Sequence, residues 1–175
     1  MKQIAVWGLL ANMALPMFSA GVVRQASYYP EGNAFVCVNG NHRYTRALYG
    51  SMAEWRVETS DRPIFAIFKK NNHRNIRFVI KCNGQAFQLD SVEYCKARYE
   101  AGKREYLMKD KRWGSGVLKL SVLAYPQTEG AVWKFVAENF GKAKIEIVCM
   151  ICETRVSKFK RAGDIGKFDG PEAFD

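Results

Sequence analysis

The sequence predicts an all-β protein, an antiparallel β-sandwich of about ten short strands. Beyond Ser27, apolar and polar residues alternate with a period of two in most segments, which is typical of strands with one buried face. Turn-forming residues recur roughly every 8 to 15 residues, and no window has the spacing of a long amphipathic helix. Short strands separated by regular turns favour a sandwich or a barrel.

The first strand pair is expected around Asn39-Gly40. An apolar segment at 35–38 precedes this dipeptide, and the alternating segment 43–48 follows it. Asn-Gly between two such segments is the strongest short-range signal for a two-residue hairpin turn, because both residues tolerate positive φ angles. We therefore expect 35–38 and 43–48 to pair as a hairpin.

The later strands follow from the same alternation, and Asn83-Gly84 predicts a second hairpin. Basic residues stand beside apolar ones in several of these segments, which is typical of a sheet with one solvent-facing side. We expect these outward positions to include Arg77, Lys96, Arg98, Lys119 and Lys134. The predicted strands are 55–58, 64–68, 76–80, 86–89, 93–99, 104–108, 117–125, 132–137 and 145–151.

The N-terminal segment 1–21 is expected to be a secretory signal peptide. Lys2 gives a positive start, the segment 4–15 is apolar except for Asn12, and Ser19-Ala20-Gly21 offers small residues for cleavage. The alternative is a buried helix of a cytosolic protein. No second apolar stretch reaches the length of a membrane span. The sequence thus predicts an exported protein, in the periplasm or at the cell surface, with a β-sandwich domain at 27–160 and a loop or truncated tail at 161–175.

The chain is basic, with 27 Lys and Arg against 17 Asp and Glu and a formal net charge of +10. Such a balance raises nucleic acid, anionic membranes and acidic polysaccharides as partners, and export favours the glycan over nucleic acid. Aromatic residues adjoin several of the basic ones. The residues proposed to bind carbohydrate are Arg98, Arg104, Arg112 and Trp113. The alternatives are that the charges are solvated strand faces and that most of the rings are core.

No catalytic residue, metal site or cofactor is predicted. Cys149 and Cys152 form a C-x-x-C, but residues three apart in a strand point to opposite faces, and no second pair exists for a zinc site. Two histidines without a third ligand nearby are weak metal candidates. Several glutamates could serve in glycoside hydrolysis, yet no pattern brings two of them together.

Several blocks of the sequence occur in the order found in a known family. They read FVCVNG at 35–40, RALYG at 46–50, RVETSDRP at 56–63, YCKARY at 94–99, AVWKF at 131–135, CMICE at 149–153 and RAGD at 161–164. Together they resemble the domain-of-unknown-function family forty-four-fifty of gut Bacteroidetes, found near the N-terminus of exported proteins that look like six-hairpin glycosidases. The resemblance implies that this chain is the front of a longer protein, with a sandwich incomplete at its C-terminus, and no catalytic residue can be transferred.

Four functions remain open. The leading hypothesis is a noncatalytic accessory module of an exported glycoside hydrolase-like protein in polysaccharide degradation, beside a glycosidase domain of the same longer chain. The second is a stand-alone carbohydrate-binding module for acidic glycans. The third is glycoside hydrolysis through two glutamates of the chain itself. The remaining alternative is a cytosolic nucleic-acid binder, which a periplasmic location of the mature protein would rule out.

Overall fold

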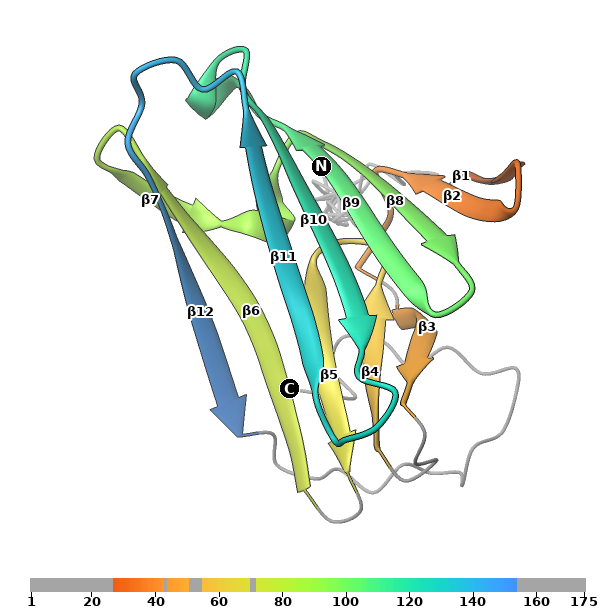
Figure 1. The fold of residues 1–175 in the computed structure, drawn as a ribbon. Coiled ribbons are helices and arrows are strands. Elements are labelled where there is room, and N and C mark those ends of the chain that lie inside the picture. The colour runs from red at the N-terminus through yellow and green to blue at the C-terminus, as the bar shows by residue number, and fades with distance from the viewer. Residues whose placement is uncertain (1–26, 43, 51–54, 70–71, 154–175) are drawn as a thin grey trace, which may run out of the picture.

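The computed structural model describes residues 27–42, 44–50, 55–69 and 72–153. The predicted signal peptide at 1–21 and tail at 161–175 lie outside these residues. The described chain forms two antiparallel sheets, and no α-helix occurs within it, which confirms the all-β prediction (Figure 1). The strands are β1 Ser27–Glu31, β2 Ala34–Val38, β3 Tyr44–Tyr49, β4 Trp55–Ser60, β5 Ile64–Lys69, β6 Asn72–Cys82, β7 Gln85–Gln88, β8 Tyr94–Glu100, β9 Lys103–Lys109, β10 Val117–Ala124, β11 Ala131–Glu138 and β12 Ile145–Glu153.

The first sheet, sheet A, has the strand order β1-β2-β8-β9-β10-β11. The second, sheet B, has the order β12-β6-β5-β4-β3, with β7 paired to β6. Two one-turn 3-10 helices, η1 at Leu89–Ser91 and η2 at Lys111–Trp113, lie in the connections on either side of β8 and β9. The edge strands β11 and β12 follow each other in the chain but belong to different sheets.

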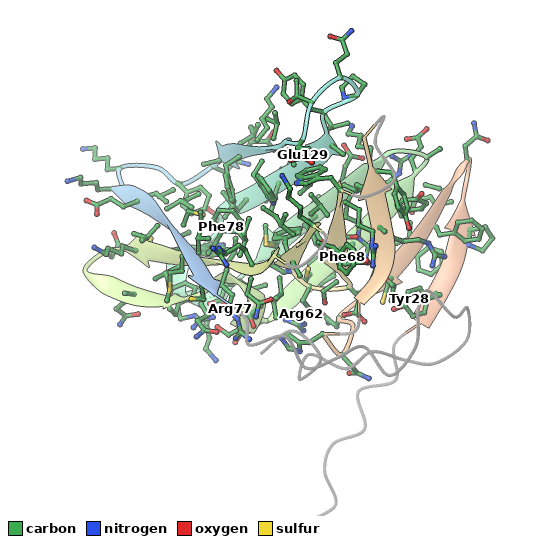
Figure 2. All side chains as sticks on the ribbon, turned by 90° about the horizontal axis from the view of Figure 1, so that it is seen from below. Tyr28, Arg62, Phe68, Arg77, Phe78 and Glu129 are labelled. Carbon is green, nitrogen blue, oxygen red and sulfur yellow. The ribbon has the colours of Figure 1, made fainter. Side chains whose placement is uncertain are left out.

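Aromatic side chains from both sheets form the centre of the core. Phe65 of β5 lies edge-on to Tyr106 of β9 and to Trp133 of β11, with ring centroids 5.7 and 5.9 Å apart. Phe78 of β6 meets Phe135 of β11 in the same way at 5.0 Å. Phe78 and its neighbour Arg77 leave β6 on opposite sides, so the strand alternates between core and solvent as the sequence predicts (Figure 2).

The hairpin predicted at Asn39-Gly40 is wrong. The β2 strand pairs with β1 and β8 in sheet A, whereas β3 pairs with β4 in sheet B, so this dipeptide carries the chain between the two sheets. Asn39 stays bonded to the start of β8: its backbone N–H donates to the Cys95 carbonyl at 2.8 Å, and its side-chain oxygen accepts from the Cys95 N–H at 2.9 Å. This pairing with a strand far along the chain outweighs the local turn preference.

The other turn prediction is confirmed. Asn83 and Gly84 have φ angles of 50° and 77°, and they join β6 to β7 in an antiparallel hairpin. A further hairpin, β1–β2, was not predicted from the sequence. Its first strand contains Pro30, which is rare inside a sheet but is tolerated in an edge strand such as β1.

Candidate functional site

A solvent-facing groove lies on the outer side of sheet A, over strands β8 to β11. Its volume is about 280 Å³. The inner positions of these strands, such as Cys95 and Ala97 of β8, are fully buried, so the alternate positions face outward. The side chains that line the groove include Lys96, Arg98, Glu105, Leu107, Lys119, Ser121, Lys134 and Val136.

The strand register arranges these side chains in two rows that cross the sheet. The first row is Arg98, Glu105, Ser121 and Lys134, each directly opposite the next. The second row is Lys96, Leu107, Lys119 and Val136. Directly opposed residues in antiparallel strands have Cβ atoms roughly 5 Å apart. The groove therefore presents four cationic side chains, the carboxylate of Glu105, two apolar side chains and a hydroxyl.

Ion pairs at the rim occupy three of the four cations. Lys96 Nζ lies 2.7 Å from Glu31 Oε2, and Lys119 Nζ lies 2.7 Å from Glu138 Oε1. Arg98 Nη1 bridges two carboxylates, Glu100 Oε2 at 2.8 Å and Glu105 Oε2 at 2.9 Å. Exposed pairs of this kind contribute about 0–1 kcal/mol each, so an anionic ligand can replace the carboxylates at small cost.

Lys134 differs from the other three cations. It lies in the middle of the edge strand β11, and its side chain is exposed to solvent. Within the part of the chain that the structure describes, it has no carboxylate partner. Its charge is thus available to a ligand without breaking an existing pair.

The carboxyl of Glu105 remains ionised in this surrounding. Burial alone would raise its pKa, but hydrogen bonds from Lys103 and Arg98, together with their charges, outweigh burial and hold the pKa below its usual range. On the partner side, hydrogen bonds to Glu100 and Glu105 raise the pKa of Arg98. Glu105 and Arg98 therefore both keep their charges at neutral pH.

Of the four residues proposed from the sequence to bind carbohydrate, Arg98 lines the groove and Arg104 does not. The side chain of Arg104 points into the sandwich and is 2% exposed. Its Nη2 donates to the carbonyl oxygen of Ser60 at 3.0 Å, and the Tyr106 hydroxyl donates to the same oxygen at 2.7 Å. Arg104 holds β9 of sheet A to the end of β4 in sheet B.

Arg112 and Trp113 lie in η2, at one end of the sandwich. The Arg112 guanidinium stacks 3.5 Å from the centre of the Phe87 ring and forms a 2.6 Å ion pair with Asp110. Trp113 is 4% exposed, and its indole N–H donates to the Gly116 carbonyl at 3.0 Å. The structure therefore does not bring the four residues together on one surface. Trp113 belongs to the core, in agreement with the alternative that most of the aromatic rings are core residues.

Sequence reasoning missed a buried polar cluster in the connection between β4 and β5. Arg62 is 1% exposed, and its guanidinium donates to three carbonyl oxygens: Gly40 at 3.0 Å, Asp90 at 2.9 Å and Val92 at 2.7 Å. The neighbouring Asp61 is fully buried and accepts hydrogen bonds from the Tyr28 hydroxyl at 3.1 Å and the Asn41 N–H at 3.0 Å. Through these bonds, β1, the segment that crosses from sheet A to sheet B, and η1 are all hydrogen-bonded to the β4–β5 connection.

Burial raises the pKa of two acidic groups near the cluster. Burial, followed by the Asp61 charge, raises the pKa of the Tyr28 hydroxyl. Burial also raises the pKa of the Cys95 thiol to about 12, although Arg62 and Arg104 act in the opposite direction. These two groups therefore stay protonated at neutral pH.

All five cysteines lie within the described residues. Cys149 and Cys152 of β12 lie opposite Phe78 and Asn75 of β6, both of which are buried. Cys149 and Cys152 are exposed, whereas Cys37, Cys82 and Cys95 are buried, and all five are free thiols. Among the described residues, no three His, Cys, Asp or Glu side chains stand close enough to hold a metal ion. No helix in the same residues is long and apolar enough to cross a membrane.

The fold and the groove define a β-sandwich domain in which the solvent-facing side of sheet A carries cationic side chains and their carboxylate partners. A family model described as "Domain of unknown function (DUF4450)" matches residues 72–175, more than half of the chain. The chain belongs to this family, which confirms the resemblance seen in its sequence blocks. No curated protein and no solved structure matches the chain.

Proposed function

We propose that this chain is a noncatalytic module of an exported polysaccharide-degrading protein, and that its sheet A groove holds an acidic polysaccharide. The observation that carries the proposal is the convergence of Lys96, Arg98, Lys119 and Lys134 on one outer face, around the apolar side chains of the second row. Carboxylate or sulfate groups spaced along a glycan would meet these cations in turn. The sugar rings would lie over Leu107 and Val136.

In this proposal the module acts beside a glycosidase domain of the same longer chain and keeps the substrate near it. Tethering of this kind raises the effective concentration of substrate at the catalytic domain without any chemistry in the module itself. The resemblance of the sequence blocks to exported glycosidase-like proteins supports this arrangement. A reading frame that continues into a helical catalytic domain would be the corresponding genetic observation.

The second candidate is a stand-alone binding module for acidic glycans. It uses the same groove, and the exposed Lys134 without a carboxylate partner among the described residues favours it equally. The two candidates differ only in whether a catalytic domain accompanies the module. A reading frame that ends at Asp175, in a protein that binds glycan, would favour the stand-alone module.

Affinity electrophoresis tests the binding step common to both candidates. The chain would run through native gels that contain polygalacturonate, a sulfated polysaccharide or a neutral glucan, at low and high salt. We expect the two acidic polymers to retard the chain at low salt and the neutral one not to. Unchanged mobility in both acidic polymers would refute the binding proposal.

A matched pair of double variants separates the groove from net charge. Lys119→Gln with Lys134→Gln removes two groove cations, whereas Lys142→Gln with Lys144→Gln removes two lysines from the β11–β12 connection. We expect the first variant to lose most of the retardation and the second to keep it. Equal losses would mean that binding follows overall charge and not the groove.

A further inference from the structure

The β12 strand forms an apolar edge of sheet B, with no further strand beside it among the described residues. It pairs with β6 along one side, and it is the last strand on that side of the sheet (Figure 1). Its residues 147–151, Ile-Val-Cys-Met-Ile, contain no charge, and we call them the apolar run. Val148 is 38% exposed, Met150 41% and Ile151 64%, so both faces of the run contact solvent.

The other sheet edges contain residues or irregularities that hinder pairing with a further strand. The β1 edge contains Pro30, which lacks an N–H to donate. The β3 edge has an irregularity between Tyr44 and Arg46 and carries that arginine, and the β11 edge carries Lys134 at its centre. Bulges and basic residues of this kind protect natural sheet edges. Among the edges that the described strands leave at the ends of the two sheets, β12 is the exception, so its outer backbone groups are suited to accept another strand.

We propose that β12 pairs antiparallel with β12 of a second copy of the chain, around a two-fold axis at Cys149. The proposal concerns a different surface from the glycan groove and does not depend on glycan binding. It would join the two B sheets into one continuous sheet across the dimer, which pairs both β12 edges at once.

Backbone geometry limits where the two-fold axis can lie. In an antiparallel pair, directly opposed residues both turn their N–H and C=O groups toward each other or both turn them away. Adjacent residues of one strand turn these groups to opposite sides. A symmetric β12–β12 pair must therefore have its axis at a residue and not between two residues.

The charge pattern then selects the register. With the axis at Cys149, Ile147 lies opposite Ile151 of the second copy and Val148 lies opposite Met150 of the second copy, so the apolar run pairs with itself over its whole length. An axis at Val148 would set Glu146 opposite Met150, and an axis at Met150 would set Ile147 opposite a glutamate. Apolar cross-strand pairs contribute roughly 0.2–1 kcal/mol each, whereas a charge opposite an apolar residue loses that gain.

Mass measurement by light scattering after size exclusion, over a range of concentrations and with reductant present, tests the dimer on the 175-residue chain. We expect the apparent mass to approach twice that of one chain. Met150→Lys should reduce it two-fold, back to the monomer, because it places charge inside the pairing edge. Val132→Lys on β11, where the side chain is similarly exposed at 42%, should leave the dimer intact. Circular dichroism and thermal unfolding would confirm that both variants fold.

Oxidative cross-linking tests the register independently. At the proposed axis the two Cys149 residues lie directly opposite, with Cα atoms about 4.5–5.5 Å apart, which suits a disulfide. Copper phenanthroline would remove two electrons and two protons from the thiol pair. We expect a cross-linked dimer with Cys152→Ser and none with Cys149→Ser.

Several outcomes would overturn the proposal. One is a monomer at every concentration, which would show that β12 does not pair with β12 of a second copy. Another is a dimer that Met150→Lys leaves intact. The third is a cross-link that persists in Cys149→Ser.

Discussion

The guanidinium of Arg62 donates its Nε–H to the carbonyl oxygen of Gly40 at 3.0 Å, and both groups are buried in the interior of the sandwich. Gly40 belongs to the segment that crosses from sheet A to sheet B, and Arg62 to the connection between β4 and β5. The bond fixes the crossing point of the chain. It also accounts for the failed hairpin, because the Asn-Gly dipeptide is engaged by partners distant in the sequence.

Replacement of Arg62 is expected to destabilise the fold strongly. Arg62→Met would keep much of the side-chain volume but leave the carbonyls of Gly40, Asp90 and Val92 without their donor. Each buried, unpaired group costs about 1–3 kcal/mol, so we expect a loss of about 3 kcal/mol or more in the free energy of unfolding. Urea denaturation would measure it.

Arg98→Met is the control for Arg62→Met, because Arg98 forms only partly exposed ion pairs. We expect its effect to remain below about 1 kcal/mol. Similar losses in the two variants would contradict the assigned role of Arg62.

Gly40→Ala is expected to be destabilising for steric reasons. A Cβ atom on Gly40 would lie 2.3 Å from Cγ of the fully buried Asp61, so the cluster would have to move. Overpacking at a fixed site costs about 1–3 kcal/mol. Gly130→Ala is the matched control, since its nearest neighbour would be Thr128 Oγ1 at 3.7 Å. Equal unfolding midpoints for the two variants would argue against a rigid contact at Gly40.

Asp110 is expected to make stability depend on pH in the acid range. Burial opposes ionisation of its carboxyl, but hydrogen bonds from the Arg112 side chain and from the backbone N–H groups of Arg112 and Glu93 hold its pKa below the usual value. The folded pKa lies below the unfolded one, so the stabilisation is present above the unfolded pKa of about 3.9 and is lost as pH falls through the folded pKa.

Urea unfolding between pH 6 and pH 2.5 would reveal this dependence. We expect the wild-type chain to lose more stability over this range than Asp110→Asn, which has no carboxyl to protonate. Parallel curves for the two proteins would show that Asp110 does not contribute.

Thiol reactivity is expected to divide the five cysteines into two groups. Cys149 and Cys152 are exposed and should react with Ellman's reagent in the native protein at pH 8. Cys37, Cys82 and Cys95 are buried, and burial raises the pKa of Cys95 to about 12, so these three should react only after unfolding in urea. A third thiol that reacts quickly in the native state would contradict the described core.

The strands were predictable because their alternation depends only on which face is buried. The same alternation held the information on Arg104: it shares the parity of Tyr106 and Met108 in β9, so all three face the core. Its neighbouring charges and ring suggested a surface site instead. At this position, the alternation along β9 predicts the buried location of Arg104, whereas the residue types beside it do not.

Other features depend on contacts between distant segments and were not predictable in the same way. Arg62 occurs in a short polar connection, and only the folded chain brings Gly40, Asp90 and Val92 to its guanidinium. The groove likewise requires the register of four strands, which places Lys134 in line with Ser121 and Glu105. The sequence indicated that Lys96, Arg98, Lys119 and Lys134 face outward, but not that they share one groove.

Mapping of backbone amide shifts by NMR, as a short oligogalacturonate is added to the isotope-labelled chain at low salt, tests the central claim most directly. The account predicts that the largest shifts fall on the groove positions of β8 to β11, around Lys119 and Lys134, and that salt reverses them. Shifts confined to sheet B or to η2, or no shifts at saturating ligand, would contradict it.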